Sequence, residues 1–153
     1  MDTDVKSEKE GKKKLVPKLR FPEFRDKGEW EEKKLGDVAD VIAGQSPSGK
    51  YYNSTGEGIP FYQGKTDFGE RYIQKPSTWT TQITKLAKSG DILMSVRAPV
   101  GALNISTEQI CIGRGLASIQ AGKSVWFLYY LLSFIHKSIV GNGGSVFDLS
   151  LIH

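Results

Sequence analysis

The chain has 153 residues, of which 39% are hydrophobic and 25% are charged, and its formal net charge is +4. This length suits one domain with a single core, and the composition is typical of a soluble globular protein. The small positive charge permits a polyanionic partner without requiring one. Cys111 is the one cysteine, which excludes a disulfide framework and cysteine-based zinc spacing. Because isoleucines flank it, Cys111 is expected in the core.

The amino-terminal residues are strongly polar. Residues 1–17 are predicted to be a disordered charged tail, since Met1–Lys14 has no apolar periodicity and no signal-peptide core. The longest apolar run, Val125–Ile135, is shorter than the roughly 20 residues that a membrane-spanning helix needs. We therefore expect a cytoplasmic protein without a membrane segment. One domain is expected at residues 18–153, and the aromatic residues of Leu19–Phe24 are expected to anchor its start.

The first half of this domain reads as short strands separated by polar loops. Glycine, proline and serine predict a loop at residues 44–50 that continues irregularly to residue 58. Thr80 or Thr81 is expected to cap a short helix at residues 80–88. The other elements predicted here are an edge strand at 30–35, a helical turn at 35–39, strands at 40–43 and 59–63, and a hairpin-like connection at 67–71 within the polar stretch 65–75.

The second half contains the most regular strand pattern. The turn at Gly90 opens an apolar strand at residues 92–96, which breaks at Arg97 and a proline-containing loop that closes at Gly101. Further strands are predicted at residues 101–105, 109–112 and 115–120. Ser124 is expected to cap a helix at residues 125–140 that Gly141–Gly144 ends. This helix is apolar nearly all round, so it should be buried or require a partner. The elements together predict an α+β fold.

Motifs for catalysis and nucleotide binding are weak in this chain. Residues 44–50 have the spacing of a phosphate-binding loop, but Tyr51 stands where a Ser or Thr would hold magnesium. Residues 117–124 match a relaxed form of the same loop, with Lys123 expected instead as an ordinary surface residue. His136 and His153 do not form a pair at metal-binding or catalytic spacing. The chain is therefore not expected to be an enzyme, and no cofactor or metal is predicted; an NTP-binding enzyme ranks third among the functional hypotheses.

Polar and basic residues gather in the loops expected at the strand ends. Side chains of these types read base edges and hold phosphates, and an arginine fixed on a strand-end loop, as expected for Arg97, suits either task. Any one of these residues alone is more simply a solvent-facing loop residue, although Tyr51 and Tyr52 beside Lys50 add aromatic character. The candidate DNA-binding residues are Gln45, Ser46, Ser48, Lys50, Gln63, Lys65, Thr66, Arg71, Arg97 and Arg114.

Four motifs in a fixed order carry a resemblance to a known family. They are Trp30-x4-Leu-Gly-Asp-Val38 with Ala43-Gly-Gln-Ser-Pro47, then Gly58-Ile-Pro-Phe-Tyr62, Gly90-Asp-Ile-Leu93, and Val100-Gly101. Over residues 18–147 the chain resembles the specificity subunits of type I restriction–modification systems, and Gly143-Gly-Ser145 matches a later turn of that family. The resemblance implies a target recognition domain with a curved, mixed, mostly antiparallel β-sheet and a few short helices. The chain is expected to be a single truncated domain of this type, without its carboxy-terminal spacer helix.

The resemblance also implies the partners. Such a domain reads one half of a bipartite sequence in double-stranded DNA and directs a methyltransferase subunit and, through it, the restriction subunit. The partner subunits hold S-adenosylmethionine and ATP, so catalysis would reside there. A homodimer or pairing with a second half subunit is left open. The second hypothesis is an interaction module that uses the apolar helix to bind the methyltransferase or another specificity subunit without reading DNA itself.

Overall fold

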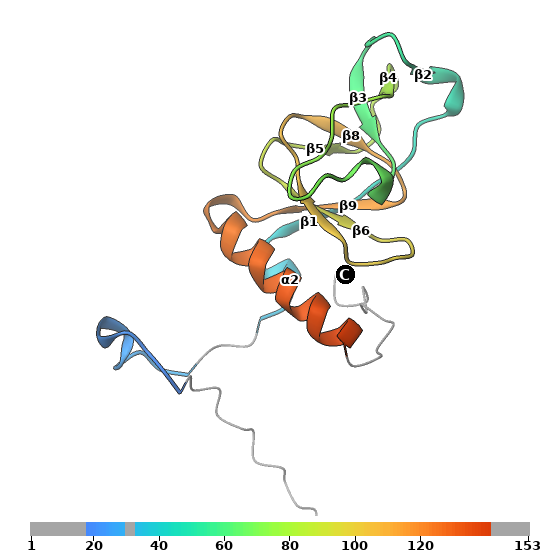
Figure 1. Cartoon of the computed structure of the whole chain (residues 1–153). Coiled ribbons are helices and arrows are strands. Elements are labelled where there is room, and N and C mark those ends of the chain that lie inside the picture. Colours follow the sequence, from blue (N-terminus) through green and yellow to red (C-terminus); the bar gives the residue numbers. More distant parts are fainter. Residues whose placement is uncertain (1–17, 30–32, 142–153) are drawn as a thin grey trace, which may run out of the picture. The chain divides into compact units, whose positions relative to one another are not determined.

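The computed structural model describes residues 18–29 and 33–141 (Figure 1), with side chains through His136. The chain divides into two units at the boundary between Lys33 and Lys34. The predicted charged tail at residues 1–17 and the predicted glycine turn around Gly143 lie outside the described residues.

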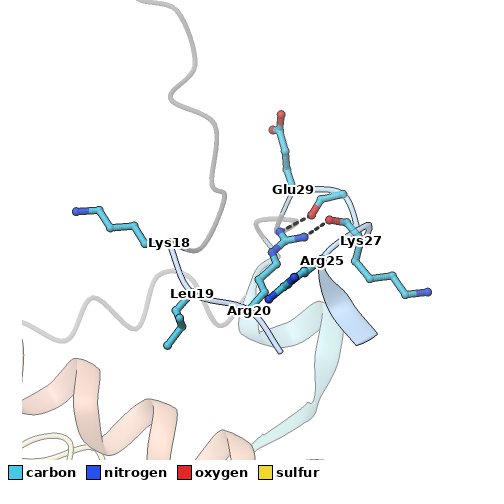
Figure 2. A pocket seen from close by; sticks show the side chains of 7 residues that line it. Lys18, Leu19, Arg20, Arg25, Lys27 and Glu29 are labelled. Atoms are coloured by element: carbon cyan, nitrogen blue, oxygen red, sulfur yellow. Dashed lines mark hydrogen bonds between the residues drawn. The ribbon is translucent and has the colours of Figure 1, made fainter. Parts of the chain in front are cut away.

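The described part of the first unit is a short self-bonded turn. Its helical element, η1 (Pro22–Phe24), begins with proline, whose fixed backbone angle and missing N–H suit the first position of a helix. The guanidinium of Arg20 closes the turn by donating to the backbone carbonyls of Lys27 and, at 2.7 Å, of Gly28 (Figure 2). It also donates to the Phe24 carbonyl at 3.2 Å. These hydrogen bonds hold the two ends of the turn together.

Among its described residues, the second unit contains two sheets and the helix α2 (Val125–Gly141). In the first, the order is β1 (Asp40–Ala43), β9 (Leu116–Gln120), β6 (Ile92–Ser95) and β7 (Leu103–Ile105), with antiparallel pairing throughout. The second has the order β2 (Tyr52–Asn53), β4 (Trp79–Thr80), β3 (Ile59–Tyr62), β8 (Ile110–Ile112) and β5 (Leu86–Ala87). There β3 and β8 run parallel, while the other pairs are antiparallel. The predicted mixed, mostly antiparallel α+β fold is confirmed, with its strands divided between two sheets.

The first sheet is the middle of three layers. Alternate residues of β6 point to opposite faces: Ile92 and Met94 belong to one apolar cluster with Leu128 and Leu132 of α2 (Val125–Gly141). Leu93 belongs to another cluster, which holds the core side chains of the second sheet. In Figure 1, α2 accordingly covers the side of the first sheet that faces away from the second. Burial on both faces explains why β6 reads as a continuous apolar run.

The helix α2 fits its predicted range to within one residue and follows a 3-10 turn, η4 (Gly122–Ser124). Its buried face carries Leu128, Tyr129 and Leu132. The opposite face keeps large apolar side chains in solvent, with exposed fractions of 64% for Phe127 and 52% for Tyr130. The helix is thus buried on one side only, although the sequence is apolar on both. Within the described residues, no helix is both long enough and apolar enough to span a membrane.

Two predicted elements differ from the structure. The helix expected at residues 80–88 is wrong: Thr80 lies in β4 and is fully buried, whereas Leu86 lies in β5 and pairs with Cys111 of β8. The threonines at the start of this segment suggested a capped helix, but sheet partners far along the chain determine the local structure. In the strand expected at residues 30–35, residues 30–32 lie outside the described residues. Leu35 instead begins the helical turn α1 (Leu35–Val38), as predicted for residues 35–39.

Candidate nucleic-acid interface

The strand directions bring four loops to one end of the molecule. Since β1 and β6 both pair antiparallel with β9, their carboxy-terminal ends and the start of β9 share one edge of the first sheet. The parallel pair β3 and β8 likewise ends at one edge of the second sheet. The segment Gly113–Gly115 then connects the end of β8 directly to β9, so the two edges adjoin. The loops after β1, β3, β6 and β8 therefore lie together, and they carry most of the candidate residues.

Glycines allow these loops to pack backbone against backbone. A Cβ atom on Gly44 would lie 2.0 Å from the carbonyl oxygen of Gly113, and one on Gly115 would lie 2.3 Å from that of Gln63. Both distances are far below van der Waals contact, so no side chain fits at either position. Backbone hydrogen bonds join the same segments: the Gly44 N–H donates to the Leu116 carbonyl at 2.9 Å, and the Gly113 N–H donates to the Tyr62 carbonyl at 2.9 Å. The base of the candidate interface is consequently closely packed.

Arg97 stands on the loop that follows β6. The hydroxyl of Ser95 donates to the Arg97 carbonyl at 3.0 Å, and the N–H of Val96 donates to the Gly115 carbonyl at 3.0 Å. The loop includes a cis peptide bond between Ala98 and Pro99. The Arg97 side chain is exposed, and its guanidinium has no hydrogen-bond partner within the part of the chain that the structure describes. Its backbone is fixed while its donors stay available.

A groove of about 510 Å³ joins the Arg97 loop to the loop after β3. Two cations, Lys65 and Arg97, border it, so it suits an anionic ligand. Lys65 lies in the short turn η3 (Lys65–Asp67). In the same turn, burial raises the pKa of the Asp67 carboxyl above its ordinary value, while a backbone hydrogen bond from Gln63 opposes that rise. Residues of several candidate loops line the groove, among them Gln63, Lys65, Thr66, Ser95, Arg97 and Pro99.

The loop after β1 forms the neighbouring part of the surface. Ser46 is tied to the β8–β9 connection, because its Oγ accepts a hydrogen bond from the Arg114 N–H at 3.1 Å. Ser48, Lys50 and Arg114 are exposed, as is Gln45. The Lys50 ammonium lies 4.9 Å from the centre of the Tyr51 ring in the turn η2 (Gly49–Tyr51). Nine of the ten predicted residues thus belong to loops that meet at this end.

Sequence reasoning missed the residues that support this loop. The Gln82 Oε1 accepts a hydrogen bond from the Ser48 N–H at 2.9 Å, and the Thr84 hydroxyl donates to the Gln45 carbonyl. Tyr52 stacks on Phe61 at 4.8 Å, and its hydroxyl donates to Pro47 at 2.8 Å. Burial, and secondarily Cys111, raises the Tyr52 pKa, whereas Arg114 lowers it. Because residues 80–88 were predicted to form a helix, Gln82 and Thr84 were not expected to support this loop. The three threonines within residues 80–84 nevertheless favoured extended structure.

Arg71 lies elsewhere. Its guanidinium carbon is 5.7 Å from the Trp126 ring centre and 5.8 Å from that of Tyr130, both on α2. The buried amide of Asn104 fixes the preceding turn by accepting from the Gly69 N–H at 3.0 Å and donating to the Gly69 carbonyl at 3.1 Å. The structure therefore does not bring Arg71 into the groove with the other candidates.

The other candidate sites lack the features that their chemistry needs. In the loop at residues 44–50, Gly44 is packed against backbone, and the following helix is the three-residue η2. Lys123 is exposed in η4. The basic hollow of the first unit, of about 500 Å³, is bordered by Lys18, Arg25 and Lys27 (Figure 2), but its central Arg20 is committed to backbone carbonyls. Among the described residues, no group of three His, Cys, Asp or Glu side chains could hold a metal ion.

Comparison with known proteins decides the family. Residues 27–150 match the model of the type I restriction modification DNA specificity domain. The chain belongs to this family. Over 125 residues it is 45% identical to a Methanocaldococcus jannaschii protein assigned as the MjaX specificity subunit of a type I restriction enzyme, covering 78% of this chain and 29% of that protein. The MjaIX specificity subunit of the same organism is 29% identical over 135 residues, with 78% and 31% covered.

Solved structures agree with this membership. The HsdS subunit from Thermoanaerobacter tengcongensis has 39% identity and a TM-score of 0.68, covering 78% of this chain and 30% of its own. A chain from a study of complex assembly and conformational transition in the type I R-M system has 39% identity and a TM-score of 0.69, with 78% and 31% covered. The S subunit from M. genitalium, at 14% identity and a TM-score of 0.52 over 71% of this chain and 27% of its own, shares the fold. This specificity-domain chain thus spans less than a third of the length of these relatives.

Proposed function

We propose that this chain is a sequence-specific module that binds double-stranded DNA and reads one half of a bipartite target in a type I restriction–modification system. The observation that carries the proposal is the convergence of four strand-end loops, with their basic and amide side chains, on one end of the two sheets. A closely packed base that presents exposed donors is suited to reading a duplex, because base contacts require defined geometry.

The candidate residues divide by chemistry into two tasks. Lys50, Lys65 and Arg114 are exposed cations suited to phosphate contacts, which position a protein on DNA without reading sequence. Arg97 is suited to a bidentate contact with the O6 and N7 atoms of guanine, while the amides of Gln45 and Gln63 match the edge of adenine. The Ser46 and Ser48 hydroxyls and Thr66 are further contacts of the same surface. For Arg71, charge alone supports a contact with DNA.

The module is proposed to have no catalytic activity of its own. It would direct a methyltransferase subunit, and through it a restriction subunit, to the chosen DNA in the cytoplasm. Family membership supports these partners.

The test is selection of bound duplexes from a randomised DNA pool, using the full chain with and without a methyltransferase subunit. Enrichment of one short motif by the chain alone is the expected result. Binding of the selected duplex should also weaken with salt, with a log–log slope of about −0.9 for each phosphate contact. Failure to enrich any motif under either condition would refute DNA reading by this chain.

The exposed face of α2 favours a second function, in which the chain binds the methyltransferase subunit or another specificity subunit. Phe127 and Tyr130 are more than half exposed, and neighbouring Trp126 is 41% exposed. Aromatic residues clustered with an arginine, here Arg71, are typical of the energetically dominant part of a protein interface. Such binding should respond little to salt. Phe127→Ser should weaken it while leaving DNA selection unchanged, and equal loss of both would argue against a separate surface.

A further inference from the structure

We infer that Ser95 is a positioning residue for Arg97, so that discrimination at one base pair depends on a buried hydroxyl that is bonded to the Arg97 backbone. This inference rests on the proposed DNA-reading function. It concerns the accuracy of that reading, and it assigns to a buried side chain an effect on specificity.

Ser95 makes three hydrogen bonds that close the Arg97 loop. It is the last residue of β6 and is 2% exposed. Its hydroxyl donates to the Arg97 carbonyl at 3.0 Å, its N–H donates to Ala102 at 2.9 Å, and its carbonyl accepts from Gly101 at 2.8 Å. The two backbone bonds join the ends of the loop, whereas the hydroxyl reaches into it. Only the hydroxyl bond acts directly on the arginine.

The surroundings of the loop leave few other directions in which it could shift. On one flank, the Val96 N–H is bonded to Gly115, whose own position excludes any side chain. On the other flank, Gly101 has φ of +94°, a conformation that favours glycine. A Cβ atom there would lie 2.5 Å from the Nδ1 of His136 on α2, so the loop end is packed against the helix. The Arg97 backbone is the part of the loop between these fixed ends.

Base reading and phosphate binding respond differently to a displaced backbone. A bidentate arginine–guanine contact needs two aligned N–H donors at fixed separation, so a small shift of the Arg97 backbone degrades it. A phosphate contact is mainly Coulombic and tolerates such a shift. Loss of the Ser95 hydroxyl should therefore lower discrimination at the base pair that Arg97 reads, and should change the number of phosphate contacts little.

The chain provides a matched control for this effect. Ser106 follows the end of β7 and is 1% exposed, and its hydroxyl donates to the carbonyl two residues later, that of Glu108, at 2.6 Å. The bond has the same pattern as that from Ser95 to Arg97. Because β7 runs antiparallel to β6, Ser106 lies at the opposite end of the sheet from the candidate interface. Ser106→Ala removes an equivalent buried hydrogen bond away from the loops.

The experiment compares Ser95→Ala, Ser95→Thr, Ser106→Ala and Arg97→Ala in the full chain. Each is measured against the duplex selected by the unmodified chain and against all its single-base-pair variants, at several salt concentrations, together with urea unfolding. Ser95→Ala should lower discrimination about 3- to 10-fold at the base pair that Arg97→Ala affects, with an unchanged salt slope. Ser95→Thr should retain the discrimination, since it retains the hydroxyl, and Ser106→Ala should retain it at equal loss of stability.

Each contrary result has a distinct meaning. If the unmodified chain selects no motif, the proposed function fails and the inference fails with it. If it selects a motif that Arg97→Ala relaxes but Ser95→Ala does not, the inference alone is overturned. Uniform loss across all duplexes, or the same relaxation in Ser106→Ala, would assign Ser95 a merely structural role and also overturn it. Should Ser95→Ala not fold, Ser95→Cys keeps a side chain of similar shape, somewhat larger and with a weaker donor, and its effect on the same base pair decides the question.

Discussion

Ser46 and Arg114 are 68 positions apart in the chain, yet the Arg114 N–H donates to the Ser46 Oγ at 3.1 Å. This bond joins the loop after β1 to the connection between β8 and β9. Ser46→Ala should lower the free energy of unfolding by about 0.5–1.5 kcal/mol and should weaken DNA binding, because both loops contribute candidate contacts. Urea unfolding and duplex titration measure the two effects. Ser54→Ala, at an exposed loop position, is the control and should change neither.

Gly44 should be intolerant of the smallest side chain. The added methyl group in Gly44→Ala would meet the carbonyl oxygens of Gly113 and Leu116 at 2.0 and 2.7 Å. Overpacking against backbone should cost at least about 1–3 kcal/mol of stability, measured by thermal unfolding. Gly49→Ala in the same loop is the matched control, since nothing lies within 4 Å of the position that its added methyl group would occupy. Equal effects of the two substitutions would contradict the close packing of the strand-end loops.

Arg97 and Lys65 border the same groove, but their replacement by alanine should affect DNA binding in different ways. Arg97→Ala should relax preference at one base pair, with a loss of roughly 1–3 kcal/mol of discrimination. Lys65→Ala should weaken binding to all duplexes alike and should reduce the magnitude of the salt slope by about 0.9. Binding to single-base-pair variants across a salt series separates the two. A uniform loss in Arg97→Ala would reassign this residue to phosphate positioning.

Tyr62 should make the fold sensitive to alkaline pH. Burial, with smaller contributions from Glu108 and Asp67, raises the Tyr62 pKa to about 12 from 10.0. Below pH 10 the Tyr62 hydroxyl is neutral in both the folded and the unfolded chain, and its contribution to the free energy of unfolding is fully present. Between pH 10 and 12 the unfolded chain loses the proton first, so the free energy of unfolding should fall by roughly 2–3 kcal/mol.

Tyr62→Phe tests this origin of the alkaline loss. The variant should be less stable near neutral pH by about 0.5–1.5 kcal/mol, because the Tyr62 hydroxyl donates to Gln74 at 2.6 Å. Its stability should then decline less between pH 10 and 12 than that of the unmodified chain. Urea unfolding at pH 8, 10 and 11 provides the comparison, with Tyr51→Phe on the surface as control. An identical decline in both variants would mean that other groups cause it.

Sequence patterns predicted the strands and the helix that are marked by a continuous apolar run. The apolar runs of β6 and β9 and the long apolar range of α2 were all located to within about one residue, because each buries a continuous surface. The prediction for residues 80–88 was wrong because this segment buries no continuous surface of its own. Thr80 and Leu86 belong to two-residue strands whose partners, at Ile59 and Cys111, lie far away in the chain, and a local pattern contains no information on such pairing.

The sequence predicted which residues belong to the candidate site, but it did not predict how they are arranged in space. Gln45, Gln63 and Arg97 were predicted in loops at strand ends, and all three are exposed there. What the sequence could not reveal is that Arg71, chemically equal to Arg97, stacks on α2 instead. Which loops share an end follows from strand order, and strand order here depends on the parallel pair β3 and β8, which no local motif specifies.

The glycines that pack the bases of the loops separate the residues of the core from the residues proposed to contact DNA. Most side chains that hold the layers together lie within strands and α2, whereas those proposed to face DNA leave from strand ends. A library randomised at positions 45, 48, 50, 63, 65, 66, 97 and 114, with Gly44, Gly113 and Gly115 retained, should therefore yield many folded members. Such a scaffold can acquire a new target through a handful of substitutions without first having to evolve a new interior.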